Sequence, residues 1–296
     1  MMRGIWYAVG AYVLWGLLPI YWKWLQQVSA LQVLCHRISW SFLTLCIIIL
    51  LMRQARIFIA AMANPRYVRA YAAASALIGI NWLTYIWAVN AAFIIETSLG
   101  YFINPLFSVL LGVIFFRERL RPWQWAAIAL ATGGVVYLTM AHGKLPWIAL
   151  TLAVTFGLYG LVKKTAPLGS LQGLTLETGI LLVPALAFLS YVDLTGKGAF
   201  LHEGLRIDVL LAGAGLITVV PLLMFASAAR RIPLSLIGIL QYIAPTLQFL
   251  IGVLVYQEPF TMTKFIGFGI VWTALVVYGV EGYLVYRSRP FPVISE

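Results

Sequence analysis

The sequence predicts an all-α integral membrane protein with ten transmembrane helices, arranged as two inverted five-helix repeats. Three observations lead to this prediction. Of 296 residues, 62% are hydrophobic and only 10% are charged, whereas soluble domains carry about 25% charged residues. Uncharged stretches of about 20 residues recur along the chain, and a helix of that length crosses the hydrocarbon core of a bilayer. Polar residues, Gly and Pro also recur at a constant offset of 140 positions.

Uncharged stretches bounded by charges or turn residues define the expected helices. Their ranges are 4–24, 29–52, 69–89, 92–116, 122–141, 146–163, 169–192, 207–229, 234–256 and 262–285. The apolar runs lack two-residue alternation, which excludes a barrel and leaves helices as the spanning structure. The start of the chain resembles a signal peptide, but Gly16 and Pro19 interrupt its long apolar part and no A-x-A-like site follows. We therefore expect an uncleaved first helix.

The positive charges predict how these helices are oriented. With a cytoplasmic N-terminus, fourteen Lys and Arg residues lie in cytoplasmic segments: Arg3, Arg53, Arg56, Arg66, Arg69, Arg117, Arg119, Arg121, Lys163, Lys164, Arg230, Arg231, Arg287 and Arg289. Five lie outside, namely Lys23, Lys144, Lys197, Arg206 and Lys264, and Arg37 falls within a helix. This excess follows the positive-inside rule and predicts that both termini are cytoplasmic. The net charge of +11 is thus explained by topology, because no basic cluster suggests a nucleic-acid partner.

The offset of 140 residues indicates an internal repeat. It pairs Lys23 with Lys163, Gln32 with Gln172, Pro105 with Pro245, Gly112 with Gly252 and Glu118 with Glu258. Because each repeat holds five helices, an odd number, the second repeat enters the membrane with opposite polarity. Two near-equivalent halves allow two packings, each open to one side, as carriers require. Some channels are also built this way, so the repeat favours a carrier without excluding a channel.

Several motifs resemble one family. The sequences RERL at 117–120, WQW at 123–125 and GG at 133–134 resemble the EamA-type repeat of the drug/metabolite transporter superfamily. The RarD branch of this family is resembled more closely by HRISW at 36–40, NWL at 81–83, WAVN at 87–90 and SLGYFINP at 98–105. In the second half, LYGLVK at 158–163, ET at 177–178 and QYIAPT at 241–246 extend the resemblance over nearly the whole chain.

The resemblance implies a permease of the bacterial cell (inner) membrane, often associated with export of chloramphenicol or related compounds. It implies one EamA-type repeat over 1–141 (spans 1–5) and a second over 142–296 (spans 6–10), the latter with a short cytoplasmic tail. It also implies a central cavity lined mainly by spans 1, 3, 4, 6, 8 and 9. An importer or facilitator for a metabolite is the alternative function within the same fold.

Aromatic and amide side chains on those spans are the candidate substrate-binding residues. Together with one carboxylate they are Trp15, Asn81, Tyr85, Glu96, Tyr101, Asn104, Tyr159, Gln241, Tyr242 and Thr246. Aromatic walls with a few amides suit an amphipathic, planar or weakly charged solute. The alternative is that many of them are interfacial belt residues or hydrogen-bond neighbouring helices. Trp6, Trp22, Trp24 and Trp123 are interpreted as belt residues from their positions.

Four ionisable residues within the expected helices are candidates for energy coupling or for a buried ion pair. They are His36, Arg37, Glu96 and Glu177, and such residues are costly in hydrocarbon. Arg37 and Glu177 are equivalent positions of the two repeats, so we expect them to pair, either in the transport cycle or merely to fix packing. Glu96 shares a helix face with Gly100 and Asn104 and is the candidate to exchange a proton with each cycle; the alternative is a hydrated residue at the interface. His36 is a titrating group or a neutral hydrogen-bonding partner.

Other features limit the remaining function classes. Cys35 and Cys46 are interpreted as packing residues, and no cofactor or metal site is expected. The chain lacks a G-x-x-x-x-G-K-[ST] motif and hydrolase motifs, so we expect a carrier driven by gradients rather than an enzyme or an ATP-driven pump. A receptor would need larger loops. Pro105 and Pro245 are expected to form paired kinks, and Glu118 and Glu258 to cap the helices that follow them. Glycines that permit close helix approach, within the bundle or in a homodimer, are Gly4, Gly10, Gly16, Gly267 and Gly269.

Overall fold

The structure, a computed structural model, describes residues 2–90, 94–142, 147–255 and 261–288. These residues form helices and no strands. The helices are α1 (Met2–Lys23), α2 (Ala30–Leu51), α3 (Ala55–Met62), α4 (Pro65–Asn90), α5 (Ile94–Phe116), α6 (Pro122–His142), α7 (Trp147–Thr165), α8 (Ser170–Leu194), α9 (Leu205–Ala229), α10 (Leu234–Leu240), α11 (Ile243–Leu254) and α12 (Met262–Ser288). Each of the ten expected ranges overlaps one of these helices, or the pair α10 and α11 for 234–256. The short helix α3 was not expected, because its eight residues fall between two spans.

Local sequence explains where several helices begin. Ser29 caps α2 by accepting a hydrogen bond from the amide of Gln32 at 3.4 Å. Pro65 and Pro122 are the first residues of α4 and α6, a position where proline loses no helical hydrogen bond. The start of α10 is stabilised from the other half of the chain. The Glu118 carboxylate accepts hydrogen bonds from the amides of Leu234 at 2.7 Å and Ser235 at 2.9 Å. The expectation that Glu118 caps the helix after its own loop is therefore corrected.

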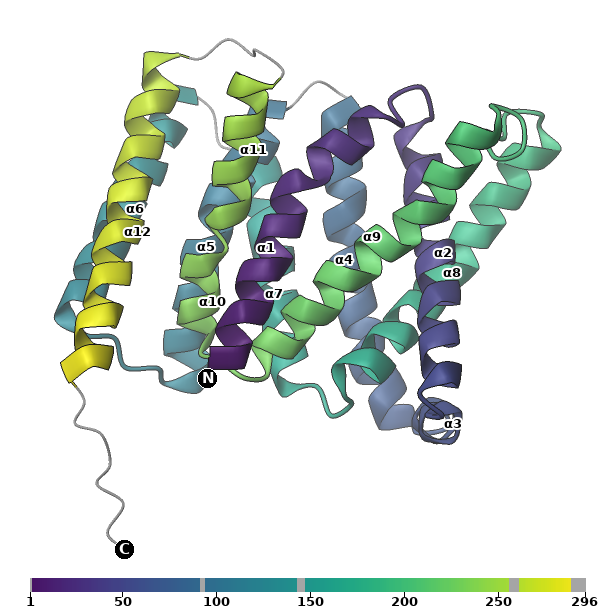
Figure 1. The fold of residues 1–296 in the computed structure, drawn as a ribbon, viewed down its shortest axis with the longest axis horizontal. Helices are drawn as coiled ribbons and strands as arrows, with labels where there is room; N and C mark the ends of the chain where they lie inside the picture. Colours follow the sequence, from purple (N-terminus) through teal and green to yellow (C-terminus); the bar gives the residue numbers. More distant parts are fainter. Residues whose placement is uncertain (1, 91–93, 143–146, 256–260, 289–296) are drawn as a thin grey trace, which may run out of the picture.

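The two halves of the chain interlock. The most extensive packing joins helices that precede residue 143 to helices that follow residue 146: α5 with α7 and α10, α6 with α12, α2 with α8 and α9, α1 with α9 and α11, and α4 with α7. In Figure 1, α6 and α12 form one edge of the bundle, α2 and α8 form the opposite edge, and α9 runs obliquely between them. Neither half buries its helix faces without the other.

Close approach between helices depends on glycine at two positions. A Cβ on Gly215 of α9 would stand 2.7 Å from the backbone nitrogen of Ser41 in α2, whose hydroxyl donates to the Gly215 carbonyl at 3.2 Å. A Cβ on Gly238 of α10 would stand 2.5 Å from the carbonyl oxygen of Pro105 in α5. Any larger residue would push these backbones apart.

The glycines considered as dimer contacts mostly pack inside the molecule. Gly4 lies against Ile232 of the loop before α10, Gly10 against Met224 of α9, Gly16 against Leu247 of α11 and Gly267 against Leu138 of α6. Around Gly269, a Cβ would meet nothing within 4 Å.

The two halves of the chain differ at their prolines. Pro105 lies inside the continuous helix α5, whereas Pro245 lies in the first turn of α11, just after the break at Gln241 and Tyr242 that separates α11 from α10. The expected pair of equivalent kinks is thus a proline within one helix and an interruption in the other. Backbone hydrogen bonds continue through this interruption, since the amides of Gln241 and Tyr242 donate to the carbonyls of Ile237 at 2.9 Å and Ile239 at 3.2 Å.

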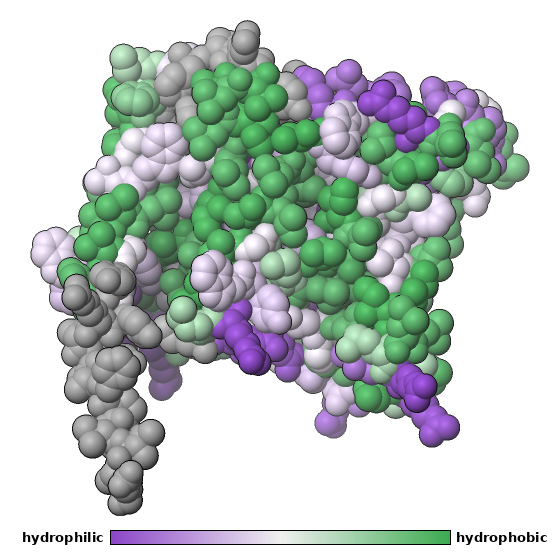
Figure 2. Space-filling model, in the orientation of Figure 1, coloured by the Kyte–Doolittle hydropathy of each residue, from purple (hydrophilic) through white to green (hydrophobic). Residues whose placement is uncertain are grey.

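The outer surface is suited to lipid. Large apolar side chains are exposed along the helices, among them Ile114 at 59% and Val183 at 72%. Figure 2 shows a mainly apolar face, with strongly hydrophilic residues toward its upper and lower edges. Within the part of the chain that the structure describes, six helices are long and apolar enough to cross a membrane: α1, α2, α7, α8, α9 and residues 265–282 of α12. The chain is therefore an integral membrane protein.

Candidate functional site

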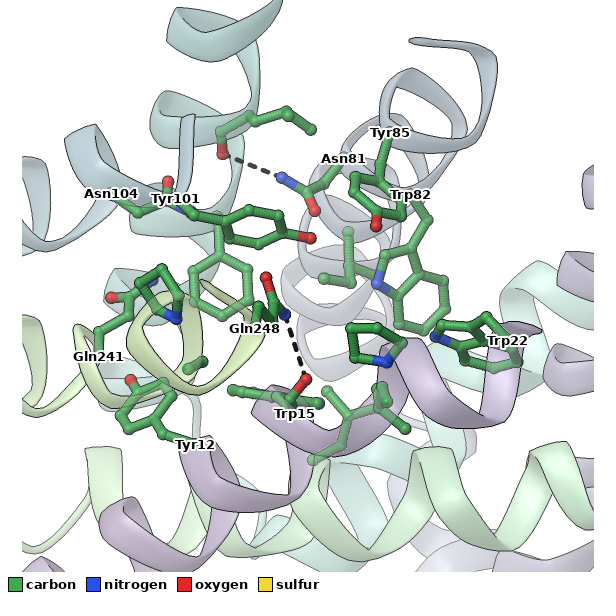
Figure 3. Close-up of a pocket in the computed structure, with 18 of the residues that line it drawn as sticks. Tyr12, Trp15, Trp22, Asn81, Trp82, Tyr85, Tyr101, Asn104, Gln241 and Gln248 are labelled. Carbon is green, nitrogen blue, oxygen red and sulfur yellow. Dashed lines mark hydrogen bonds between the residues drawn. The ribbon is translucent and has the colours of Figure 1, made fainter. Parts of the chain in front are cut away.

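A cavity lies at the centre of the bundle, between helices from both halves (Figure 3). It has a volume of about 110 Å³. The lining residues come from α1, α2, α4, α5, α7, α9 and α11 and from the break before α11: Tyr12, Trp15, Leu18, Pro19, Trp22, Arg37, Ile78, Asn81, Trp82, Tyr85, Tyr101, Asn104, Leu152, Phe156, Leu222, Gln241, Ala244, Pro245 and Gln248. Aromatic rings and amides predominate, and Arg37 is the ionisable cation among them.

Two of the side-chain amides on the cavity donate hydrogen bonds to neighbouring helices, and the oxygen of a third has no hydrogen-bond partner. Asn81 donates to the Leu152 carbonyl and to the Thr155 hydroxyl, both at 2.9 Å, and so joins α4 to α7. Gln248 donates to the carbonyl of Trp15 at 3.2 Å, which joins α11 to α1. The side-chain oxygen of Asn104 is buried and has no hydrogen-bond partner. The first two amides therefore hold the cavity walls together, whereas Asn104 keeps an acceptor available.

Arg37 is held between two indole rings at the side of the cavity. Its guanidinium carbon lies 4.2 Å from the centre of the Trp82 ring and 5.5 Å from that of Trp22, distances at which a cation is attracted to an aromatic face. Its Nε is buried without a hydrogen-bond partner. Trp22 thus lines the cavity, which corrects its interpretation as a belt residue. In Figure 3, Trp22 and Trp82 lie together on one side of the cavity, and Asn104 and Gln241 lie on the other.

Glu177 does not pair with Arg37 as expected. Its carboxylate accepts hydrogen bonds from Lys163 Nζ at 2.8 Å and from the Tyr159 hydroxyl at 3.0 Å. Lys163 and Glu177 are only 3% and 1% exposed, so this is a fully buried ion pair. The physical reason is the α7–α8 hairpin, whose short connection brings the two side chains together. Lys163, counted as a cytoplasmic charge from the sequence, instead lies inside the bundle.

An aromatic plug separates the cavity from this ion pair. The plug consists of Tyr12, Trp15, Phe156, Tyr159 and Phe225, whose neighbouring ring centres lie 5.4–6.4 Å apart. Tyr12, Tyr159 and Phe225 are at most 1% exposed. Such tilted and edge-on ring packing excludes water and is favourable beyond the area that it buries.

One face of α7 passes the cavity, the plug and the ion pair in turn. Leu152 and Phe156 line the cavity, Tyr159 belongs to the plug, and Lys163 binds Glu177. The spacings of four, three and four residues place all four side chains on the same helix face. The end of α7 that carries Lys163 lies at the same end of the bundle as the N-terminus (Figure 1). The face therefore traces a path from the cavity toward that end.

Six of the predicted binding residues lie on the cavity, namely Trp15, Asn81, Tyr85, Tyr101, Asn104 and Gln241. Three others point elsewhere. Tyr159 reaches Glu177, as above; Tyr242 donates to the carbonyl of Phe102 at 3.2 Å, and Thr246 accepts from the Trp272 indole at 2.9 Å. This part of the chain lines the cavity with Gln241, Ala244, Pro245 and Gln248, a helical spacing that leaves Tyr242 and Thr246 on other faces, toward α5 and α12.

The two remaining ionisable candidates are His36 and Glu96. His36 is buried, with its ring centre 5.2 Å from that of Phe200, and does not line the cavity. Glu96 lies in the first turn of α5, where its side chain is outside the described part of the structure. The described residues contain no group of three His, Cys, Asp or Glu residues that could hold a metal ion.

Sequence reasoning missed several residues of this region, among them Tyr12, Trp22, Trp82, Gln248 and Lys163. Trp22 and Lys163 lie near helix ends, where a belt position or a cytoplasmic charge is the usual interpretation. The offset of 140 residues offered one signal for Lys163. Lys163 matches Lys23 at this offset. A lysine at the same position in both halves is less typical of a loop charge that has no specific role.

Known proteins resemble this chain over most of its length. Residues 2–140 match the EamA-like transporter family. "Uncharacterized transporter YojE" of Bacillus subtilis is 44% identical over 279 residues, which are 93% of this chain and 93% of that protein. "Protein RarD" of Streptomyces exfoliatus is 42% identical over 93% of this chain and 87% of that protein. A solved crystal structure with 18% identity has the same fold, with a TM-score of 0.70 over 94% of this chain and 97% of that one.

The relatives cover nearly the whole chain, and their identity far exceeds what a shared fold alone gives. The motifs that carried the resemblance also span both halves. The chain therefore belongs to the EamA-like transporter family, as a permease of the RarD type.

Proposed function

We propose that this protein is a secondary active transporter that exports a small organic solute by alternating access, with the central cavity as its binding site. The solute is a drug or metabolite of modest size, and chloramphenicol-like compounds are one class that fits aromatic and amide walls. The protein spans the bacterial inner membrane ten times with both termini in the cytoplasm, as the distribution of Lys and Arg favours.

One observation carries this proposal: equivalent positions of the two halves line the same cavity. Four pairs at the offset of 140 both line it, namely Tyr12 with Leu152, Trp82 with Leu222, Tyr101 with Gln241 and Asn104 with Ala244. A site on the axis between two related halves can be exposed to either side when one half rocks against the other.

Helix packing supports the same two-fold relationship. The offset of 140 makes α1 equivalent to α7, α2 to α8, α4 to α9, α5 to α10 and α11, and α6 to α12. Each contact between two helices therefore predicts a contact between their equivalents. The contacts α5–α7 and α1–α11, α2–α9 and α4–α8, and α1–α9 and α4–α7 are such pairs, and all six occur. Equivalent helices also contact each other directly, in α2–α8, α5–α10 and α6–α12. This pattern is what repeats over 1–141 and 142–296, related by an axis in the membrane plane, would give.

The aromatic plug supports access from one side at a time. The cavity extends from the plug toward Trp22 and Arg37, near the end of α1 and the start of α2. Those helix ends lie opposite the N-terminus (Figure 1). In the proposed orientation, the plug and the Lys163–Glu177 pair close the cytoplasmic side. The described structure then corresponds to the outward-facing state of the cycle.

Proton coupling is proposed at Glu96. It precedes Tyr101 and Asn104 on α5, and both of these line the cavity. Glu177 is held by Lys163 and Tyr159, and His36 faces Phe200. Glu96 is therefore the carboxyl group best placed along the chain to bind and release a proton with each cycle.

Uptake into proteoliposomes tests the proposal. Purified protein is reconstituted, and uptake of labelled amino acids, nucleosides and phenicols is measured with and without an imposed pH gradient. The wild type is compared with Glu96→Gln and with the control Glu203→Gln, which changes an exposed residue of the loop before α9. Gradient-driven flux that is lost only in Glu96→Gln supports a proton-coupled exporter. Gradient-independent flux in all three proteins makes this a facilitator, and no flux of any solute refutes transport through the cavity.

A further inference from the structure

The charge of the cavity suggests what kind of solute it binds. Arg37 lines the cavity, and its guanidinium remains positive at neutral pH. None of the described residues that line the cavity is an Asp or a Glu. Among the acidic side chains that the structure describes, buried Glu177 is already engaged by Lys163 and Tyr159. No acidic side chain that the structure describes pairs with Arg37, and an anionic solute would give this cation a counter-charge in a low-dielectric interior.

The surroundings of Arg37 favour a carboxylate. Trp82 and Trp22 hold the guanidinium through their ring faces, a contact that leaves the N–H groups at its edge free. Its Nε is buried without a partner. The planar fork of N–H donors matches the two oxygens of a carboxylate, and the flanking rings restrict how the guanidinium can turn.

Two further polar atoms on the cavity lack hydrogen-bond partners, and they predict that the solute also carries a hydrogen-bond donor. The Asn104 side-chain oxygen and the Tyr12 hydroxyl are both buried without hydrogen-bond partners, and both residues line the cavity. An amide oxygen only accepts hydrogen bonds. A solute that donates an O–H or N–H to Asn104 would satisfy it, while Trp15 and Phe156 offer an apolar wall for the rest of the molecule.

We infer that the cavity binds a small organic carboxylate that also carries a hydroxyl or N–H donor and an apolar body. Arg37 binds the carboxylate, and Asn104 accepts the hydrogen bond. This inference rests on the proposed function, since it names the class of solute that the same cavity carries.

Tryptophan fluorescence gives a direct binding assay, because Trp15, Trp22 and Trp82 all line the cavity. The full-length protein in detergent micelles is titrated with 3-phenyllactate and with its neutral amide, 3-phenyllactamide. The two probes have the same shape and differ in charge. We expect the acid to bind roughly tenfold to a hundredfold more tightly, as for a charge-assisted hydrogen bond. Equal affinity of the wild type for both probes would overturn the inference without any variant.

Three variants place the binding group. Arg37→Gln should abolish the preference for the acid, and Arg37→Lys should retain part of it, because lysine keeps the charge but not the fork. Arg206→Gln, at the exposed start of α9, should leave it unchanged. Melting temperatures show whether each variant is folded. A folded Arg37→Gln protein that still prefers the acid as strongly as the wild type would show that Arg37 is not the anchor.

A further pair of probes tests Asn104. The wild type should bind 3-phenyllactate several-fold more tightly than 3-phenylpropanoate, which lacks the hydroxyl. Asn104→Leu should reduce this difference and keep the preference for acid over amide. An unchanged difference in Asn104→Leu would remove Asn104 from the site.

The proposed function is tested separately by counterflow of the same probes in proteoliposomes. Carboxylate binding through Arg37 without flux of any solute would refute transport and keep the binding site. Flux of neutral solutes without carboxylate binding would support transport and refute the carboxylate site.

Discussion

Lys163 and Glu177 form a buried ion pair across the α7–α8 hairpin, with 2.8 Å between Nζ and the carboxylate. The pair lies beyond the aromatic plug as seen from the cavity, and Tyr159 of the plug also donates to it. Glu177 is further fixed through its backbone, whose carbonyl accepts from the Ser75 hydroxyl of α4 at 3.1 Å. Three helices therefore meet at one charged contact on the side of the plug that faces away from the cavity.

Removing one partner of this pair should destabilise the protein more than removing both. Glu177→Gln leaves the Lys163 charge buried, which costs about 3–5 kcal/mol in comparable cases. Lys163→Met in the same chain removes that charge and should restore most of the loss. Thermal denaturation in detergent of both single variants and the double variant measures the coupling. Strictly additive losses would show that the two side chains do not depend on each other.

The Tyr159 hydroxyl should contribute to stability through its hydrogen bond to Glu177. Tyr159→Phe removes only this hydroxyl, and a hydrogen bond to a charged group contributes about 1.5–3 kcal/mol. We expect a lower melting temperature for Tyr159→Phe and no change for the control Tyr191→Phe, since Tyr191 is 65% exposed. If both variants melted like the wild type, the hydrogen bond would make no net contribution.

The contact between α2 and α9 should not accept a methyl group. In Gly215→Ala, the new Cβ would stand 2.7 Å from the Ser41 nitrogen, and overpacking of this kind costs about 1–3 kcal/mol. Gly133→Ala is the matched control, because a Cβ there meets nothing within 4 Å. That change should stabilise α6 by up to about 1 kcal/mol through helix propensity. Equal melting temperatures for the two variants would contradict the close approach.

Glu118 should stabilise the start of α10 from the opposite half of the chain. Glu118→Ala removes the acceptor of two backbone N–H groups, and loss of such a cap costs about 0.5–2 kcal/mol. We expect a lower melting temperature and faster hydrogen exchange in α10, measured by mass spectrometry. Glu203→Ala, in an exposed loop, should change neither. Faster exchange in α6 instead of α10 would favour the cap first expected from the sequence.

The ten helical ranges predicted from the sequence all fall on helices, and seven of the nineteen residues that line the cavity were among the predicted site residues. Asn81 and Tyr101 could be chosen because polar groups within apolar helices need partners or line a cavity. Tyr242 and Thr246 were predicted wrongly, since the helix face that lines the cavity carries Gln241, Ala244, Pro245 and Gln248 and leaves these two residues on other faces. Glu177 pairs with Lys163 because of the geometry of the α7–α8 hairpin. The prediction of Arg37 as its partner relied only on the offset of 140 residues, which does not specify this geometry.

The backbone of one residue shows the same limit. Arg117 has a φ of 52°, a left-handed conformation that is uncommon for a residue with a side chain. It follows the end of α5 and precedes Glu118, which reaches α10 instead of its own helix. Sequence patterns treat RERL at 117–120 as a charged loop, and nothing in its composition indicates a contact with a segment more than 110 positions away.

The interlocking of the halves also constrains how the protein is made. The first six helices leave the ribosome before α7 exists, and their most extensive packing is with the later helices α7 to α12. Until these are synthesised, Asn81 has no Leu152 carbonyl to bind and Gly215 is not yet there for α2 to pack against. The nascent first half must therefore remain lipid-solvated and loosely assembled while translation continues. A ribosome that stalls after α6 would leave a membrane-inserted fragment without a folded state, which the quality-control proteases of the cell would have to remove.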